Sequence, residues 1–404
     1  MAFQQGLSGL NTASRNLDVI GHNIANANTV GMKASRAEFA ELYASSINAS
    51  GGVNSGIGVT VATVSQMFTQ GNISVTGNDM DVAINGNGFF ELAMPDGSMA
   101  YSRAGMFKLD RDGAIITNTG GQLMGYPTDA AGVRQGFDSV PLTLPTGGPI
   151  PAKQTTAIAA EFNLDASAPI AATVVPPTPL GTYATSVNAF DAQGLEIPVG
   201  LVFDKIGNNQ WNVYTSVNNA DPALSVPFAI TFLADGSLDP ATVIPQLQLA
   251  SPNDPALTFN VDLDFGEATQ FGADFSVSNL TQDGYRPGEL TSLGIEESGV
   301  IMARYSNGQS QAAGQISLVN FRNVQGLVPT GGGNWATTFE SGEPVRGAPG
   351  EGKLGALRSG ALEDSNIDLT GELVNMMTAQ RAYQANAQTI KTQDQVLSTL
   401  LNMR

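Results

Sequence analysis

The sequence predicts a mixed fold, in which α-helical coiled-coil termini flank two nested β-rich domains. Three observations lead to this class. Apolar residues recur every seven positions at both ends of the chain, as in packed helices. Between the ends, short β-branched and aromatic runs alternate with Gly, Asn and Asp turns. Two proline- and glycine-containing stretches divide this β-rich middle into an inner and an inserted part.

The N-terminal helix is predicted from one apolar column and one mixed column. The apolar column has four members at a spacing of seven residues, and the mixed column contains mostly small and polar residues. Polar residues on the rest of the surface are mainly uncharged, which suits close packing among identical copies. The residues assigned to assembly are Phe3, Leu7, Leu10, Leu17 and Ile24.

The C-terminal helix repeats this pattern. Ser365 precedes its apolar column, and Asp368 and Glu372 place acidic groups near the positive end of a helix. An ordinary amphipathic helix on its own core is the alternative for either end alone, but two ends with the same pattern favour assembly helices. The residues assigned to assembly are Leu369, Leu373, Met376, Tyr383, Ile390, Leu397 and Leu401.

The β-rich middle is divided by linkers at 140–153 and 282–288, and a flexible joint at 347–352 precedes the last helix. Asp112-Gly113 predicts a hairpin turn between two short strands. The predicted organisation is nested. It comprises a terminal helical core (1–33 and 362–404), linking segments (34–70 and 347–361), an inner β-domain (71–145 and 284–346) and an inserted outer β-domain (146–283).

Composition excludes several classes of function. The chain has 404 residues and a formal net charge of −18, which disfavours nucleic acid and anionic membranes as partners. It contains no cysteine and one histidine, so thiolate chemistry is impossible and a transition-metal site is not expected. No apolar run is long enough for a membrane span, and the N-terminus lacks the features of a cleaved signal peptide.

The candidate chemical motifs lack residues that a cofactor, metal or catalytic site requires. Gly86 and Gly88 lack the third glycine and the helix of a dinucleotide loop, so they predict a turn. Asp110 and Asp112 lack the further ligands of a calcium loop. His22 lies within the predicted assembly helix, and no nucleophile elbow surrounds a serine. We therefore expect no catalytic, cofactor-binding or metal-binding residues, no cofactor and no enzymatic activity.

The segment LDVIGHNIANANTVGMKASRAEF at 17–39 resembles the N-terminal signature of flagellar rod and hook proteins. Met32 stands where the family usually has an aromatic residue, and methionine can still pack there. Segments 76–92, 101–113 and 362–404 resemble the inner domain and the C-terminal helix of the same family. The matching motif residues are Asn23, Ile24, Ala25, Asn26, Asn28, Thr29, Gly31 and Lys33.

Within this family, the inserted domain at 154–283 favours a hook subunit, because distal rod proteins generally lack a large insertion. Segments 180–199 and 271–309 also resemble hook proteins. The resemblance implies a structural subunit that polymerises into a curved tubular universal joint and transmits torque from motor and rod to filament. It further implies that the two terminal helices of one molecule pair along their apolar columns.

The resemblance also implies the partners. They are other copies of the chain, the distal rod protein, the hook cap protein, the hook–filament junction protein and the flagellar type III export apparatus, without nucleic acid or membrane insertion. The expected location is the extracellular hook of the bacterial flagellum, after export without a cleaved signal. The alternatives are a distal rod or other axial protein, a secreted β-domain adhesin or carbohydrate-binding protein, and an enzyme.

Overall fold

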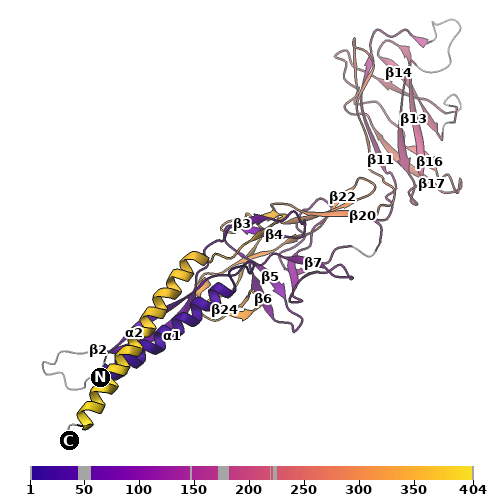
Figure 1. Cartoon of the computed structure of the whole chain (residues 1–404). Coiled ribbons are helices and arrows are strands. Elements are labelled where there is room, and N and C mark those ends of the chain that lie inside the picture. The colour runs from indigo at the N-terminus through magenta and orange to yellow at the C-terminus, as the bar shows by residue number, and fades with distance from the viewer. Residues whose placement is uncertain are drawn as a thin grey trace. The chain divides into compact units, whose positions relative to one another are not determined.

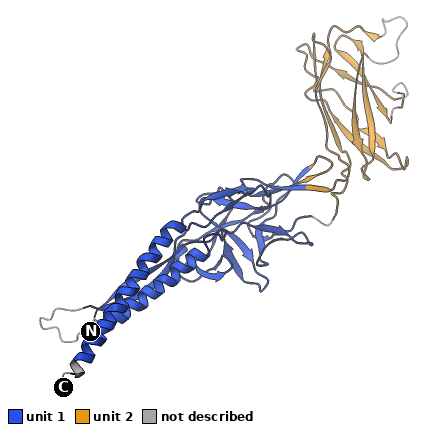
Figure 2. Cartoon of the chain, viewed as in Figure 1, with its two compact units in different colours: residues 1–147, 292–303, 310–404 blue, residues 148–291, 304–309 orange. Residues whose placement is uncertain are grey.

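The computed structural model describes residues 2–43, 56–145, 148–171, 182–218, 220–221 and 225–402. The chain forms two compact units, which Figure 2 distinguishes by colour. Unit 1 contains residues 1–147, 292–303 and 310–404. Unit 2 contains residues 148–291 and 304–309.

The described part is mostly β-structure, with one long helix at each end. Helix α1 comprises Ala2–Ala25 and helix α2 comprises Leu369–Asn402. The two helices lie side by side (Figure 1), although more than 300 residues separate them in the chain. The prediction of a β-rich fold with helical ends is therefore confirmed, whereas a coiled coil remains a prediction.

Both helices are shorter than the predicted helical segments. Helix α1 ends at Ala25, eight residues before the predicted boundary at Lys33. The side chain of Asn26 donates to the carbonyl of His22 (2.9 Å), which satisfies an acceptor at the helix end. Helix α2 begins at Leu369, because the Asp368 carboxylate accepts from the amide of Thr370 (3.0 Å) and caps the helix. The start therefore lies four residues after Ser365, which we expected to mark it.

The segment predicted as a link after the first helix contains an antiparallel hairpin. Strand β1 (Ser35–Tyr43) pairs with β2 (Gly56–Gln66) from Ser35↔Gln66 to Tyr43↔Gly56. Both strands pack along α1. The hairpin therefore belongs to the same layer of unit 1 as the terminal helices.

The rest of unit 1 is built around a 13-stranded sheet whose main path is β20-β21-β22-β9-β5-β6-β25-β24. Strands β20 (Leu290–Ile295) and β21 (Val300–Tyr305) contribute residues to both units. The other described strands are β3 (Ile73–Val75), β4 (Val82–Asn85), β5 (Phe89–Ala93), β6 (Met99–Ser102), β7 (Phe107–Leu109), β8 (Ile115–Thr117), β9 (Gln122–Tyr126), β10 (Val140–Pro141), β22 (Ser310–Ile316), β23 (Leu318–Asn320), β24 (Val328–Gly331), β25 (Asn334–Ala336), β26 (Val345–Gly347), β27 (Ala356–Ser359) and β28 (Ala361–Glu363).

Two apolar clusters stabilise unit 1. The larger contains Phe90 and Phe107, whose rings meet edge to face with centroids 5.1 Å apart. The smaller is aromatic and gathers Phe89 and Trp335 beside one another. The turn predicted at Gly113 joins β7 to β8, and its φ of +81° is a conformation that glycine adopts without strain.

Unit 2 consists of two sheets that share one core. One sheet has the order β16-β17-β11-β18, with β19 also paired to β11, and the other has the order β12-β13-β14-β15. Alternating buried residues on β11 and β13 face the shared core, as expected of a sandwich. The strands are β11 (Ala157–Asp165), β12 (Tyr183–Phe190), β13 (Glu196–Gly207), β14 (Gln210–Val217), β15 (Phe228–Thr231), β16 (Leu247–Ala250), β17 (Thr258–Asp264), β18 (Thr269–Phe271) and β19 (Ser276–Gln282).

Two segments that we assigned to the inner domain, 284–291 and 304–309, cluster with unit 2 instead. The reason is backbone pairing between the two linkers. Ile150 bridges Gly288, and Lys153 bridges Tyr285. The side chain of Asn307 then donates to the carbonyl of Arg286 (2.7 Å), which draws the tip between β21 and β22 to the same linker. The finer fourfold division remains a prediction.

No helix in the described ranges is long and apolar enough to cross a membrane.

Candidate functional site

Helices α1 and α2 meet through small residues. A Cβ atom added at Gly6 would lie 3.1 Å from Cγ1 of Ile390. One added at Gly9 would lie 2.8 Å from the side-chain oxygen of Asn386. Ala13 and Ala379 are buried in the same region. The absence of larger side chains thus lets the two helix backbones approach closely.

The apolar columns lie beside this seam and remain largely open to solvent in a single chain. Phe3 and Leu369 are each 47% exposed, and Leu397 is 54% exposed. Leu7, Leu373 and Tyr383 are also exposed, whereas Leu10, Leu17, Ile24, Met376 and Ile390 are half-buried. The side chain of Leu401 lies outside the described residues. Pairing of the two columns within one molecule, which we expected, is therefore not what the structure has.

The helical repeat accounts for the exception of Ile390, which does contact α1. A column with a strict spacing of seven drifts by about 20° per heptad around a straight α-helix. The column on α2 thus begins at Leu369 on an open flank and turns toward α1 after three heptads. Three of the five residues of this column, Leu369, Tyr383 and Leu397, therefore remain exposed in one chain.

The motif residues gather where α1 ends and the chain turns back. Asn23 is buried, donates to the carbonyl of Ser35 (2.8 Å) and accepts from its amide (2.9 Å). Gly31 has a φ of +71°, and a Cβ atom there would lie 2.5 Å from the backbone nitrogen of Ala104. Only glycine fits this close approach of two backbones. Ile24 and Asn26 are half-buried, whereas Ala25, Asn28 and Thr29 are exposed.

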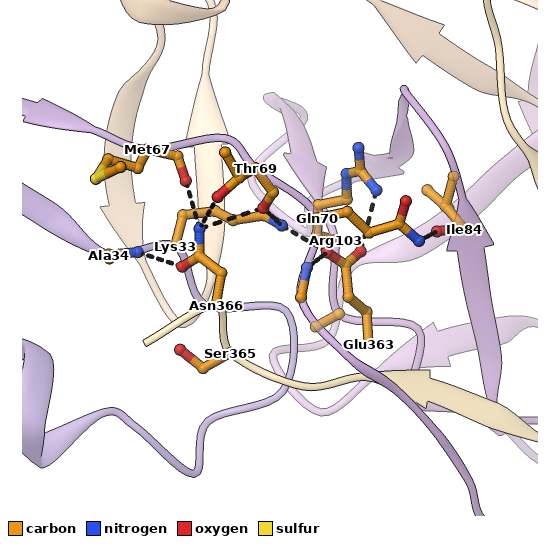
Figure 3. A network of polar contacts seen from close by, with 12 residues as sticks. Lys33, Ala34, Met67, Thr69, Gln70, Ile84, Arg103, Glu363, Ser365 and Asn366 are labelled. Carbon is orange, nitrogen blue, oxygen red and sulfur yellow. Dashed lines mark hydrogen bonds and ion pairs between the residues drawn. The ribbon is translucent and has the colours of Figure 1, made fainter. Parts of the chain in front are cut away.

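Lys33 reaches a fully buried ion pair at the base of the helices (Figure 3). Its Nζ lies 2.5 Å from Oε1 of Glu363 and donates to the carbonyl of Thr69 (2.8 Å). Nη1 of Arg103 lies 3.0 Å from the other carboxylate oxygen, Oε2. Burial lowers the pKa of both Lys33 and Arg103, and the charge of Glu363 opposes that change. We name Lys33, Arg103 and Glu363 the buried triad.

Asn366 extends this polar network along the chain (Figure 3). Its side-chain oxygen accepts from the amide of Ala34 (2.7 Å), and its side-chain nitrogen donates to the carbonyl of Met67 (2.7 Å). The same nitrogen also lies 3.2 Å from the carbonyl of Thr69. One side chain just before α2 thus joins the entry of β1 to the exit of β2.

A groove of about 470 Å³ lies between α1, β1 and α2. Its lining includes Ile20, Asn375 and Ala382. Glu372 also lines it, and the Oε2 atom of Glu372 is buried without a hydrogen-bond partner in the structure. The flank of the helix pair therefore offers both apolar side chains and an unused acceptor.

The residues of the candidate chemical motifs lie in a helix and in turns. His22 is exposed, and its ring nitrogen Nδ1 lies 3.3 Å from the side-chain nitrogen of Asn26. Gly86 and Gly88 occupy the turn between β4 and β5 with positive φ angles. Among the described residues, no three His, Cys, Asp or Glu side chains gather as a metal site requires. The distinctive features of unit 1 are thus the open helical columns and the buried triad.

Comparison with known families assigns a match to each of these regions. A model described as flagellar basal body rod protein matches residues 3–33, and the FlgEFG basal body rod C-terminal model matches 358–403. The hook protein FlgE/F/G D1 domain matches 83–163, and the FlaE D2 domain matches 163–285. The fold and its helical ends are thus those of the flagellar rod and hook class.

Full-length relatives narrow the class. The chain is 42% identical to flagellar hook protein FlgE of Escherichia coli K12 and 40% identical to that of Salmonella typhimurium, with complete coverage of both chains in each case. The crystal structure of Helicobacter pylori flagellar hook protein FlgE2 covers 72% of this chain with all of its own length, at 15% identity and a TM-score of 0.53, a likeness of fold. The chain belongs to the FlgE family of flagellar hook proteins.

Proposed function

We propose that this chain is the structural subunit of a bacterial flagellar hook, and that it polymerises through its terminal helices. The observation that carries the proposal is the open face of the helix pair. Leucine, methionine and phenylalanine side chains on α1 and α2 keep about half of their surface in solvent in one chain. Exposed apolar side chains in this number on one helix pair mark an interaction surface.

The small-residue seam within one molecule and the open columns between molecules would have different roles. The seam holds α1 against α2, so that each subunit presents one helix pair. The columns then pack on the helix pairs of other copies, in the manner of a coiled coil. A contact of this kind between different surfaces of identical subunits does not close on itself and gives an open helical tube.

The low charge of the helix surfaces supports a joint that bends while it rotates. On α1, Arg15 and Asp18 are the charged side chains between Phe3 and Ala25. Uncharged polar surfaces can shift against one another at small cost, since no ion pairs must break. Unit 1 would then transmit torque, and unit 2 would contact neighbouring copies and set the curvature of the tube.

Membership of the hook protein family supports the remaining parts of the proposal. The subunit would be exported by the flagellar type III apparatus without cleavage of a signal and would fold outside the cell beneath a hook cap protein. The distal rod protein would lie below the polymer and the hook–filament junction protein above it. The subunit would act without catalysis.

Electron microscopy and sedimentation of the purified full chain test the proposal. We expect tubes that pellet and that bend without breaking. Dispersed particles at every protein concentration, salt concentration and pH tested would contradict it. Binding of a carbohydrate by such particles would instead support the adhesin alternative.

A further inference from the structure

The buried triad contacts both the segment that follows α1 and the segment that precedes α2. We propose that Arg103 and Glu363 form a neutral socket in unit 1 for the side chain of Lys33. Lys33 then enters the socket as a second cation and fixes the N-terminal segment to the C-terminal one. Glu363 is thereby the positioning residue for both assembly helices.

The buried triad contains more positive than negative groups. Glu363 supplies one carboxylate, whereas Lys33 and Arg103 supply two cations, and their side chains are 0%, 0% and 5% exposed, in the order Glu363, Lys33, Arg103. Each carboxylate oxygen contacts one of the cations. The remaining acceptors are backbone carbonyls, namely Thr69 for the lysine and Gly86 for the arginine. A second buried carboxylate in unit 1, Glu91, has a single cation partner in Arg346.

The three residues come from segments of different character. Glu363 ends β28, which pairs with β3, and Arg103 directly follows β6 in the sheet. Both are therefore held by the β-structure of unit 1. Lys33 lies in the irregular segment between α1 and β1, which carries no ladder of its own. Withdrawal of Lys33 leaves a one-to-one ion pair in the socket, whereas loss of the Glu363 charge leaves two buried cations.

Backbone contacts bring the same two segments together. The amide of Gly31 donates to the carbonyl of Glu363 (2.8 Å), and the amide of Ala34 donates to Asn366 (2.7 Å). Hydrogen bonds at both ends of the contact thus hold residues 31–34 against residues 363–366. A displacement of either segment would remove the carboxylate from Lys33, and the lysine would lose its only acidic partner among the described residues.

Substitution of single members should therefore have unequal effects. Lys33→Met keeps the Arg103–Glu363 pair, and the carbonyl of Thr69 keeps a donor from Asn366 (3.2 Å). Glu363→Gln leaves two cations without a counter-charge, and uncompensated buried charges are costly. Combining the two substitutions removes one of those cations. The double variant should thus be milder than Glu363→Gln alone, although it alters one residue more.

Hydrogen exchange of the full chain, as monomer and as pelleted tubes, tests this order. The reporters are the amides of Gly31, Ala34 and Ser35, and Asp364→Asn is the control, because that neighbouring carboxylate contacts Ser74 rather than a cation. The comparison uses the form, monomer or tube, in which the wild type protects these amides from exchange. In that form, we expect Glu363→Gln to speed exchange by about 100-fold or more and Lys33→Met by less than about tenfold. The double variant should recover about tenfold of the loss.

An additive result, with the double variant as fast as or faster than Glu363→Gln, would overturn the socket. So would a Lys33→Met effect as large as that of Glu363→Gln, or a lack of protection in both wild-type forms. If Glu363→Gln does not fold, folding of the double variant decides the same question. The proposal draws on the proposed function for the tubes only. A chain that forms no tubes would contradict that function, while exchange in the monomer would still decide the coupling.

Discussion

Leu373 provides the sharpest perturbation of the open face of α2. It lies between Leu369 and Met377 at spacings of four residues, so the three side chains form one strip on the helix. They are 47%, 47% and 52% exposed in the order of the chain. Burial of a whole side chain of this size contributes about 1.5–3 kcal/mol, so the open half of each is worth about 1 kcal/mol on assembly.

Two substitutions at this position separate lost contact from buried charge. Leu373→Ala should cost about 1 kcal/mol and raise the soluble subunit concentration that remains beside the polymer by about fivefold. Leu373→Asp also buries an unpaired carboxylate, which brings the cost to about 4 kcal/mol and the rise to about 1000-fold. Sedimentation of the polymer and assay of the supernatant measure both values.

The matched control is Leu233→Asp in unit 2, because the contacts proposed for unit 2 set the curvature of the tube and do not drive polymerisation. Leu233 is 42% exposed, so the same substitution changes a leucine of similar exposure away from the helices. It should alter the soluble concentration by no more than about twofold. Circular dichroism melts should show that all three variants fold. Wild-type polymerisation of Leu373→Asp would refute our reasoning, because the strip would then face solvent in the polymer.

Further predictions concern each unit by itself. Burial and the charge of Glu91 raise the pKa of Tyr101 to about 12. As the pH rises, the unfolded chain loses this proton before the folded chain does, so unit 1 should lose stability from about pH 10 to 12. Circular dichroism melts should show a shallower loss for Tyr101→Phe. Burial alone would raise the pKa of Asp283, but hydrogen bonds from Thr156 and Ala157 hold this pKa well below its usual range. The stability that this carboxylate contributes should therefore be lost as the pH falls below about 4. Asp283→Asn should remove this part of the acid dependence. A Cβ atom at Gly71 would lie 1.9 Å from the carbonyl oxygen of Asp364, so Gly71→Ala should destabilise unit 1 by about 1–3 kcal/mol in denaturant titrations, whereas Gly272→Ala, with open space around it, should be neutral. Equal effects of the two glycine substitutions would show that the backbone at Gly71 can move aside.

The sequence was informative where a structure depends on nearby residues. The heptad repeats identify both helices, because a long amphipathic pattern is a strong local signal. The turn at Gly113 was equally local, since it depends on one residue with positive φ. The ends of the helices were placed less well. Helix α1 ends where the Asn23 side chain holds Ser35, a contact that the periodicity does not contain.

The buried triad could not be assembled from the sequence. Lys33 and Glu363 are 330 positions apart, and Arg103 and Glu363 are 260 positions apart. The sequence identifies Lys33 as a motif residue, and no residue near it in the chain indicates its partner. The orientation of the apolar columns does not follow from the sequence for a related reason. Glycine and alanine on a second stripe of α1 allow closer packing than the larger residues of the column, and the periodicity does not rank the two stripes.

Helical reconstruction of the assembled tube at side-chain detail tests polymerisation through the terminal helices most directly. We expect α1 and α2 of each copy to keep their small-residue seam, with Leu369, Leu373 and Tyr383 buried against helices of neighbouring copies. Tubes in which these side chains face the lumen or solvent, with subunits joined through the β-structure alone, would contradict assembly by the helical columns.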